Sequence, residues 1–250
     1  MQNAWKRLRV MKIDILTLFP EMFVPLKTSI IGRAVNSGKL EINVHDIRDY
    51  TLDKHKKCDD TPFGGGAGMV MMPQPIADCV KAVDPDRKAR RIYMSPRGKV
   101  FNQQAVLEYA KCDNLLILCG HYEGVDQRVL DLFFDEELSI GDYVLTGGEI
   151  PAMAVVDAVS RYVDGVIKSD SLSQESFSSG LLEYPQYTRP QEFMGEKVPE
   201  VLTSGNHGAV DKWRLERSLQ ITKANRPDLY EKLPLELTNP TPKKSKRGKK

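Results

Sequence analysis

The stretch Asn114-Leu-Leu-Ile-Leu-Cys119 is almost continuously apolar and is followed at once by Gly120. Such a short apolar run, bounded by a turn residue, predicts a strand that is buried on both faces. Further strands are predicted on either side of it, over Lys12–Phe19, Leu40–Ile47, Arg91–Met94 and Leu138–Leu145. Helical spacing of apolar residues predicts helices over Ser29–Ser37, Gln74–Val83, Asn102–Ala110, Val125–Leu132 and Ile150–Tyr162. Short apolar strands that alternate with helices indicate an α/β domain, a mostly parallel sheet covered on both faces.

The alternation ends near Ile167, which predicts an α/β domain over residues 1–167. Residues 168–183 begin with a polar, serine-rich run and are expected to be an interdomain linker. Beyond them, Ala209–Ala224 predicts a helix with apolar residues on two sides, and Pro227–Leu233 predicts a second short helix. We therefore expect residues 184–250 to form a small helical domain with a basic tail.

The composition is that of a globular protein, with 250 residues, 41% hydrophobic and 28% charged. No apolar run approaches the roughly 20 residues of a membrane span, and a secretion signal is not apparent, so a cytoplasmic protein is expected. The four cysteines form no Cys-x-x-Cys pair and have no zinc-site spacing. Reduced, mostly buried thiols and no metal site are therefore predicted.

Charge is distributed unevenly along the chain. The net charge is +2, but Lys243 to Lys250 hold six basic side chains and no acid, so the remainder carries about −4. The tail could add affinity for phosphates or could simply be a solubilising terminus. A loop with Lys54, His55, Lys56 and Lys57 has the same two interpretations.

Glycines cluster after successive predicted strands, at Gly64 to Gly68, at Gly120 and Gly124, at Gly141, and at Gly147-Gly148. In an open α/β sheet, ligands bind where such loops meet at the carboxyl ends of strands. None of these loops has the phosphate-binding spacing Gly-x-x-x-x-Gly-Lys-Ser/Thr, and the Gly64 run does not open a helix after a strand. Nucleotide hydrolysis and nicotinamide binding are therefore disfavoured.

Two longer segments resemble a known family. They are Leu118-Cys-Gly-His-Tyr-Glu-Gly-Val-Asp-Gln-Arg128 and Ser139-Ile-Gly-Asp-Tyr-Val-Leu-Thr-Gly-Gly-Glu-Ile-Pro-Ala-Met153, and both closely resemble bacterial tRNA (guanine-N1)-methyltransferases, the TrmD family. Shorter matches are Phe19–Phe23, Pro62–Met69, Tyr93–Pro96, Tyr187–Pro190 and Trp213–Ser218. The resemblance runs from Met11 to about Leu233, leaving out only the leader and the tail.

This resemblance implies a trefoil-knotted, SPOUT-like sheet domain that binds S-adenosyl-L-methionine as methyl donor, and it leaves open whether Mg²⁺ assists. The implied cofactor-binding residues are Tyr93, Met94, Ser95, Pro96, Gly120, Tyr122, Glu123, Gly124, Ile140, Gly141, Asp142, Tyr143, Val144, Leu145, Gly147, Gly148 and Pro151. Backbone groups of these loops could bond adenine and ribose, and apolar neighbours could accept the flat ring. Glu123 is the nearest carboxylate for the cationic end of the cofactor, or else a loop-capping glutamate.

The resemblance also implies the reaction, methylation of N1 of guanine 37 in tRNA by a homodimer. In that dimer each site takes cofactor residues from one subunit and tRNA-facing residues from the other. The resemblance also implies that the C-terminal domain, residues 184–250, binds the tRNA. Glu175 stands where the family has its general base, although the usual residue there is aspartate. Arg161 matches an essential arginine that would stabilise charge on the guanine, and Glu183 matches a substrate-positioning carboxylate. Each of the three also has a plainer interpretation as a solvated surface side chain.

Two rival functions remain in view. A related knotted methyltransferase acting on another RNA position is expected to lack the Glu175-Ser-Phe177 and Tyr187-Thr-Arg-Pro190 segments, so their presence favours guanine N1 in tRNA. A non-catalytic RNA-binding protein could keep the fold and work through its C-terminal helices and basic tail. The intact glycine loops and Arg161 argue against that second alternative.

Overall fold

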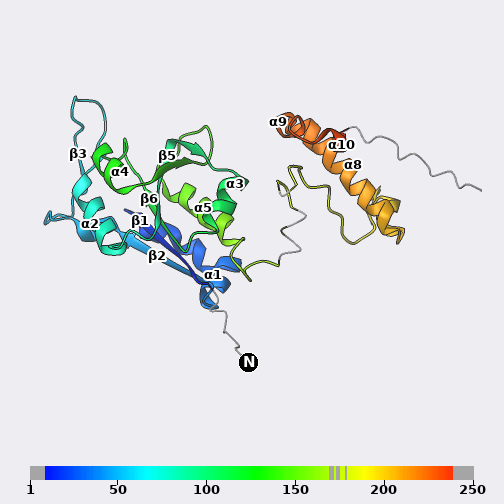
Figure 1. The fold of residues 1–250 in the computed structure, drawn as a ribbon, viewed down its shortest axis with the longest axis horizontal. Helices are drawn as coiled ribbons and strands as arrows, with labels where there is room; N and C mark the ends of the chain where they lie inside the picture. Colours follow the sequence, from blue (N-terminus) through cyan, green and yellow to red (C-terminus); the bar gives the residue numbers. More distant parts are fainter. Residues whose placement is uncertain (1–8, 169–171, 173–174, 178, 239–250) are drawn as a thin grey trace, which may run out of the picture. The chain divides into compact units, whose positions relative to one another are not determined.

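The computed structural model describes residues 9–168, 172, 175–177 and 179–238. The chain divides into two compact units, residues 1–167 and residues 168–250 (Figure 1). Most of the basic leader and all of the basic tail that the sequence singles out lie outside the described residues. In the part of the chain that is described, no helix has the length and apolar character that crossing a membrane requires.

The first unit is built on a five-stranded sheet in the order β2-β1-β6-β5-β7, and all four neighbouring pairs are parallel. The strands are β1 (Met11–Thr17), β2 (Leu40–Asp46), β5 (Arg90–Val100), β6 (Asn114–Cys119) and β7 (Glu136–Ser139). Strand β6 lies in the middle of the sheet, and its residues from Leu115 to Cys119 are all buried. The predicted α/β class with a mostly parallel sheet is confirmed, and the trefoil knot stays a prediction.

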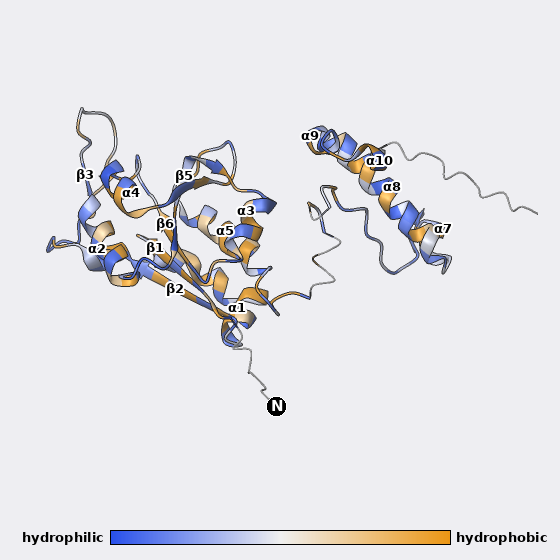
Figure 2. Ribbon diagram, in the orientation of Figure 1, coloured by the Kyte–Doolittle hydropathy of each residue, from blue (hydrophilic) through white to orange (hydrophobic). Residues whose placement is uncertain are grey.

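Helices cover both faces of this sheet, as Figure 1 shows. One face packs against α1 (Ser29–Asn36), α3 (Gln103–Tyr109), α5 (Glu149–Ser160) and the 3-10 helix η1 (Pro20–Lys27). The other packs against α2 (Pro73–Val83), α4 (Gln127–Phe133) and the 3-10 helix η2 (Ile47–Tyr50). Side chains of a strand alternate between the two cores, so Ile15 faces the first and Leu16 the second. This is why the central strand β6 reads as a nearly continuous apolar run. In Figure 2 the outer strand β2 and the end of β5 also carry hydrophilic residues in blue.

The predicted strand over Leu138–Leu145 is wrong beyond its first two residues, because β7 ends at Ser139. The Ser139 hydroxyl donates to the Gly141 carbonyl at 2.9 Å and accepts from the Gly141 N–H at 3.2 Å, which turns the chain out of the sheet. Val144 is 82% exposed. The apolar residues of this stretch therefore belong to a loop and not to a buried strand.

Strand β5 is longer than predicted and continues past Pro96 to Val100. Its pairing with β7 shifts register between Met94 and Lys99, which marks a bulge. Gly98 makes the second stretch of pairing possible, since a Cβ there would lie 2.3 Å from the backbone nitrogen of Leu138. The Ser-Pro-Arg-Gly sequence gives no strand signal by itself, so its extended form depends on the neighbouring strand.

The second unit contains the helices α7 (Glu200–Thr203), α8 (His207–Asn225), α9 (Pro227–Tyr230) and α10 (Leu235–Thr238), and a small hairpin formed by β8 (Glu192–Phe193) and β9 (Glu196–Lys197). The Asn206 side chain caps α8 by accepting from the Ala209 N–H at 3.1 Å. The hairpin turn has positive φ at Met194 and Gly195 and was not predicted. Within α8, the buried residues that the structure describes are polar, Ser218 and Thr222.

The described residues of 175–183 pack within this second unit. The Leu182 N–H donates to the Thr222 hydroxyl at 2.9 Å, and that hydroxyl donates to the Ser218 carbonyl at 2.7 Å. Leu181 is buried beside them. A role of residues 168–183 as an interdomain linker stays a prediction, but its described second half is tied to α8.

Candidate active site

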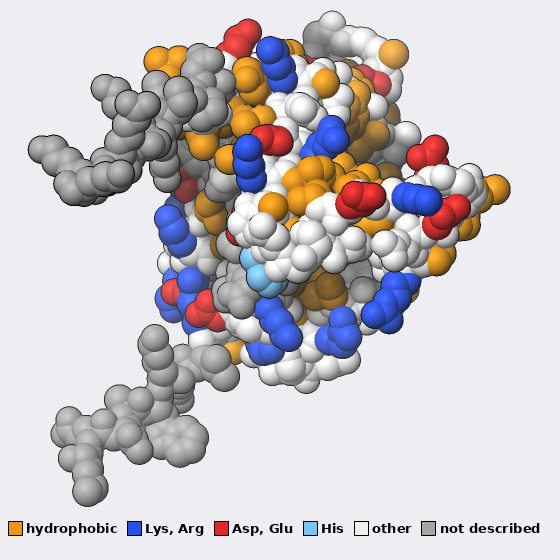
Figure 3. All heavy atoms as spheres, turned by 90° about the vertical axis from the view of Figure 1, so that its right-hand side faces the viewer, with side chains coloured by type: hydrophobic (Ala, Val, Ile, Leu, Met, Phe, Trp, Pro, Cys, Tyr) orange, Lys and Arg blue, Asp and Glu red, His pale blue; other side chains and the backbone are white. Residues whose placement is uncertain are grey.

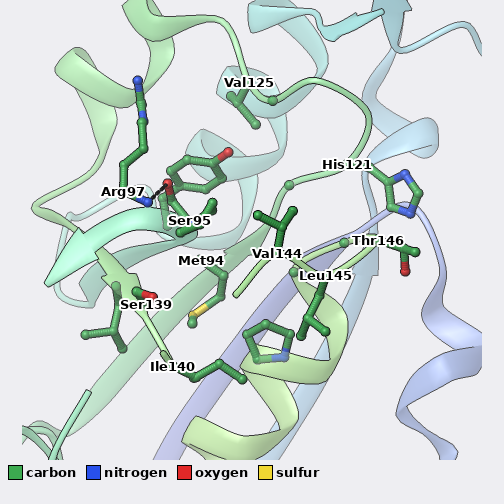
Figure 4. A pocket seen from close by; sticks show the side chains of 18 of the residues that line it. Met94, Ser95, Arg97, His121, Val125, Ser139, Ile140, Val144, Leu145 and Thr146 are labelled. Atoms are coloured by element: carbon green, nitrogen blue, oxygen red, sulfur yellow. Dashed lines mark hydrogen bonds between the residues drawn. The ribbon is translucent and has the colours of Figure 1, made fainter. Parts of the chain in front are cut away.

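A cavity of 340 Å³ opens in the first unit, just past the ends of β6 and β7 and beside the bulge of β5. It is lined by residues 93–97, 120–125, 138–141 and 143–148, together with Pro151 at the start of α5 (Figure 4). Loops at the carboxyl ends of parallel strands are the usual position for a ligand in this type of fold. Every residue predicted to bind the cofactor lines this cavity except Asp142, which lies exposed in the same loop.

Two glycines let the walls of the cavity approach each other closely. A Cβ at Gly120 would lie 2.7 Å from the Tyr93 ring, and one at Gly148 would lie 2.7 Å from the Cα atom of Cys119. The Gly148 N–H donates to the Gly120 carbonyl at 2.9 Å, which joins the two loops directly. Backbone, and not side chains, therefore forms this wall.

The loop after β7 supplies an apolar wall. Ile140, Val144 and Leu145 come from this single loop, as Figure 4 shows. The loop is held by its own bonds, since the Tyr143 N–H donates to the Gly141 carbonyl at 3.0 Å, in addition to the two bonds between Ser139 and Gly141. A flat apolar ring and neighbouring backbone donors and acceptors could be bound together here.

The loop after β6 forms the opposite rim and is braced by a second hairpin, β3 (Asp59–Asp60) with β4 (Val70–Met71). The Glu123 N–H donates to the Met69 carbonyl at 3.0 Å, and the Met71 N–H donates to the Gly124 carbonyl at 2.9 Å. Gly68 leaves room for the Glu123 side chain, because a Cβ there would lie 2.5 Å from its Oε1 atom. The rim therefore presents an exposed carboxylate beside the cavity.

Burial shifts the pKa of two tyrosines in the walls and of the cysteine that precedes Gly120. Burial raises the pKa of Tyr93 to about 12 and raises the pKa of Tyr122 as well. Burial also raises the pKa of the Cys119 thiol well above its usual value. At neutral pH these groups can donate hydrogen bonds or pack, but Cys119 is not a nucleophilic thiolate.

Six lining residues escaped the sequence-based prediction, namely Arg97, His121, Val125, Leu138, Ser139 and Thr146. His121 and Thr146 lie between predicted residues, and the other four lie one or two positions beyond the predicted segments. The Arg97 guanidinium bonds Glu137 at 2.9 Å and Gln127 at 3.1 Å. The centroid of the His121 ring lies 4.8 Å from that of the Phe19 ring, so His121 packs against the N-cap residue of η1.

The three residues predicted to act on the substrate do not line this cavity. Arg161 is the C-cap of α5 in the first unit. Glu175 is half-buried in the second unit, where Glu183 accepts from the Gln186 side-chain amide at 2.6 Å and donates its N–H to Ser176 at 3.0 Å. Their roles therefore stay predictions. Over the described ranges there is no group of three or more His, Cys, Asp or Glu residues placed to hold a metal ion.

Comparisons with known proteins agree with one another. The family model described as tRNA (Guanine-1)-methyltransferase TrmD matches residues 11–232. A tRNA (guanine-N(1)-)-methyltransferase of Clostridium perfringens is 58% identical over 226 residues, which cover 90% of this chain and 95% of that protein. One from Ruminiclostridium cellulolyticum is 56% identical over 228 residues, 90% of this chain and 98% of that protein. A third, from Clostridium acetobutylicum, is 56% identical over 226 residues, covering 90% and 93%.

Proposed function

The chain belongs to the TrmD family of tRNA (guanine-1)-methyltransferases, and from this membership we propose that it methylates N1 of guanine 37 in tRNA, next to the anticodon. The methyl donor is S-adenosyl-L-methionine. The observation that supports the proposal most directly is the glycine-walled cavity, because the loops that form it are the segments that resemble the family.

The residues present fit this donor. The cavity offers apolar side chains for the adenine ring, and backbone donors and acceptors where Gly120 and Gly148 keep side chains away. The carboxylate of Glu123 lies at the rim, where it would attract the cationic end of the molecule. The volume of the cavity, 340 Å³, lies within the range usual for small-molecule sites. When bound, the sulfonium supplies an electrophilic methyl group.

The protein must then orient the guanine and remove the proton from its N1 atom. We assign proton removal to the carboxylate of Glu175, and we assign stabilisation of the negative charge that develops toward O6 to the guanidinium of Arg161. Glu183 positions the substrate. In this scheme the bound donor would supply the methyl group to N1 of the guanine, and Glu175 would carry away the proton that N1 loses. No covalent intermediate with the enzyme is needed.

The remaining parts of the proposal concern assembly and location. We propose a cytoplasmic homodimer with a trefoil knot, in which Glu175 and Glu183 of one subunit serve a cofactor cavity of the other. Apolar side chains left exposed in the first unit support a partner surface, among them Val144 at 82%, Val24 at 55% and Ile150 at 48%. Sedimentation should therefore give twice the mass of the chain.

The decisive test is transfer of labelled methyl from S-adenosyl-L-methionine to two unmodified tRNA transcripts. One carries guanine at position 37 after guanine 36, and the other carries adenine at 37. Label in the first transcript alone is the expected result. Label in neither, with S-adenosyl-L-methionine failing to bind in a calorimeter, would support a non-catalytic RNA-binding protein, and label in both would mean a different acceptor position.

A further inference from the structure

A second cavity, of 410 Å³, lies entirely within the second unit. Its walls come from residues 184–189 and Gln191, from Val198, Leu202 and Thr203, and from α8 at Val210, Trp213 and Arg214. The family resemblance assigns tRNA contact to the C-terminal part of the chain as a whole but gives this cavity no role of its own. Its lining brings three aromatic rings, those of Tyr184, Tyr187 and Trp213, together with the two arginines Arg189 and Arg214.

Aromatic rings and arginines of this unit lie close to one another in pairs. The Tyr187 and Trp213 rings lie 6.2 Å apart at their centroids and are tilted by 59°. The guanidinium of Arg214 lies 4.9 Å from the Tyr184 ring centre, and that of Arg217 lies 5.6 Å from the Trp213 ring centre. Tyr187 remains 49% exposed, so a face or edge of this aromatic group is open to a ligand.

The charges in the wall are of one sign. Among the described residues that line the cavity, the charged ones are Arg189 and Arg214, with no aspartate or glutamate. The Nε atom of Arg214 is buried and has no acceptor within the described parts of the chain. A buried donor that lacks an acceptor is the kind of group that a bound ligand or water satisfies. On the face shown in Figure 3, basic and acidic side chains are interspersed, so attraction of an anion would depend on such local groups.

We propose that this cavity holds one unstacked nucleobase of the tRNA, against Tyr187 and Trp213, with a flanking phosphate near Arg189 and Arg214. This inference rests on the proposed function for the identity of the RNA. Stacking on aromatic rings is how proteins bind splayed-out bases, and arginine suits the neighbouring phosphate. No acidic side chain in the described lining could take a proton from a base. The cavity is therefore an anchoring site for a base, and the methyl group is transferred elsewhere.

Binding can be tested by fluorescence, because the chain has two tryptophans, Trp5 and Trp213. In a Trp5→Phe protein the emission comes from Trp213 alone. Titration with an anticodon stem–loop RNA should quench that emission, and free S-adenosyl-L-methionine should not. In the same background, Tyr187→Ala should weaken stem–loop binding about tenfold, since one base stack is lost, whereas Tyr187→Phe keeps the ring and should bind within twofold of the parent.

Kinetics separates anchoring from chemistry. Tyr187→Ala should raise the KM for tRNA about tenfold and leave kcat within about twofold, because anchoring affects binding and not the transferred proton or methyl. Lys212→Gln removes a charge next to Trp213 in the sequence, but it does not line the cavity and should change neither constant. Half-exposed Tyr187 can be truncated without emptying a core, and circular dichroism of both Tyr187 variants checks this.

The two proposals fail differently. If the wild type transfers no methyl but stem–loop RNA quenches Trp213 and the effect depends on the Tyr187 ring, the base site stands and the proposed reaction does not. If methylation is normal while Tyr187→Ala changes neither the quenching nor the KM, the cavity does not hold a base. A fall in kcat of Tyr187→Ala at unchanged KM would also overturn anchoring and would place the residue in the reaction itself.

Discussion

The two cavities differ in the secondary structure that supports them and in whether backbone or side chains form their walls. The cavity in the first unit lies at the ends of strands with fully buried side chains, such as Ile117 in β6. Backbone atoms form one of its walls. The cavity in the second unit lies beside α8, and side chains form its walls. The buried residues that the structure describes in α8 are Ser218 and Thr222. A site that must align a reacting methyl group needs the stiff arrangement, whereas a site that only anchors a base can tolerate the softer one.

The same difference appears in the hydropathy of the elements. The central strand β6 is apolar from Leu115 to Cys119, while α8 carries blue and orange side by side in Figure 2. Leu215 on α8 remains 41% exposed, so the helix predicted to need two packing partners has little apolar cover within its own unit. The second unit should therefore be the first to open locally when the protein is destabilised.

The largest effect is expected where each unit contributes to the chemistry. Arg161→Ala in the first unit and Glu175→Ala in the second should each lower kcat about a thousandfold, because charge stabilisation and a positioned base each contribute that order of rate. Cofactor affinity, measured by calorimetry, should remain within about threefold in both. Wild-type rates in either variant would remove that residue from the scheme.

Two further variants sharpen this test. Glu175→Asp restores the residue usual in the family and should keep kcat within about tenfold, because the carboxylate remains and only one methylene is lost. The double variant Arg161→Ala with Glu175→Ala should be little slower than the slower single variant if both residues act on one transition state. Independent, multiplying losses would mean that the two units contribute separate steps.

The next largest effect tests the stiffness of the first cavity. Gly148→Ala places a Cβ 2.7 Å from the Cα atom of Cys119 and 2.9 Å from the nitrogen of Gly120, and backbone atoms cannot move aside as a flexible side chain can. We expect the dissociation constant for S-adenosyl-L-methionine to rise about a hundredfold and the melting temperature to fall. Calorimetry and thermal unfolding measure the two. Unchanged affinity of the variant for S-adenosyl-L-methionine would show that the backbone at this wall can move to accommodate the added methyl group.

The sequence predicted the parts of the fold that depend on local pattern. Asn114–Cys119 is a strand with the predicted bounds, because a buried central strand must be apolar throughout. The pattern failed at Val144, where apolar side chains line a cavity and not a core, and at Pro96 to Val100, where the partner strand imposes the extended form. These errors arise because one chain segment cannot reveal what its neighbours will be.

The candidate site shows the same limit. The glycine clusters predicted where a ligand cavity would lie, but which glycine serves a close approach, as Gly148 does, became visible only with Cys119 beside it. The predicted functional residues came from the family resemblance. Nothing in the polarity of residues 184–191 predicted the second cavity, because its walls join that segment to Trp213, more than twenty positions away.

A smaller effect tests the polar interior of the second unit. Thr222→Val keeps the shape of the side chain but removes the acceptor for the Leu182 N–H, at a cost of about 1 to 3 kcal/mol for an unsatisfied buried donor. Hydrogen exchange should show faster opening of α8 and unchanged protection of β6. As a control, Thr203→Val, whose hydroxyl bonds the Glu200 carbonyl at an exposed position, should cost less than about 0.5 kcal/mol. Equal loss of protection in β6 would mean that the two units unfold as one.

The smallest expected effect is a gain in stability, and it compares the same glycine-to-alanine change in the two units. Gly208 lies in the first turn of α8, and the nearest atom to a Cβ there is the Asn206 side-chain oxygen at 3.7 Å, an ordinary contact. Gly208→Ala should therefore stabilise the second unit by about 0.5 to 1 kcal/mol, because alanine loses less backbone entropy in a helix than glycine does. Denaturant unfolding followed at Trp213 in the Trp5→Phe background measures it. The glycine-to-alanine change that disrupts the cavity wall at Gly148 would then stabilise α8 at Gly208.

If Gly208→Ala instead destabilises the protein, the start of α8 must contact something outside this unit, and a second subunit would be the first candidate to examine.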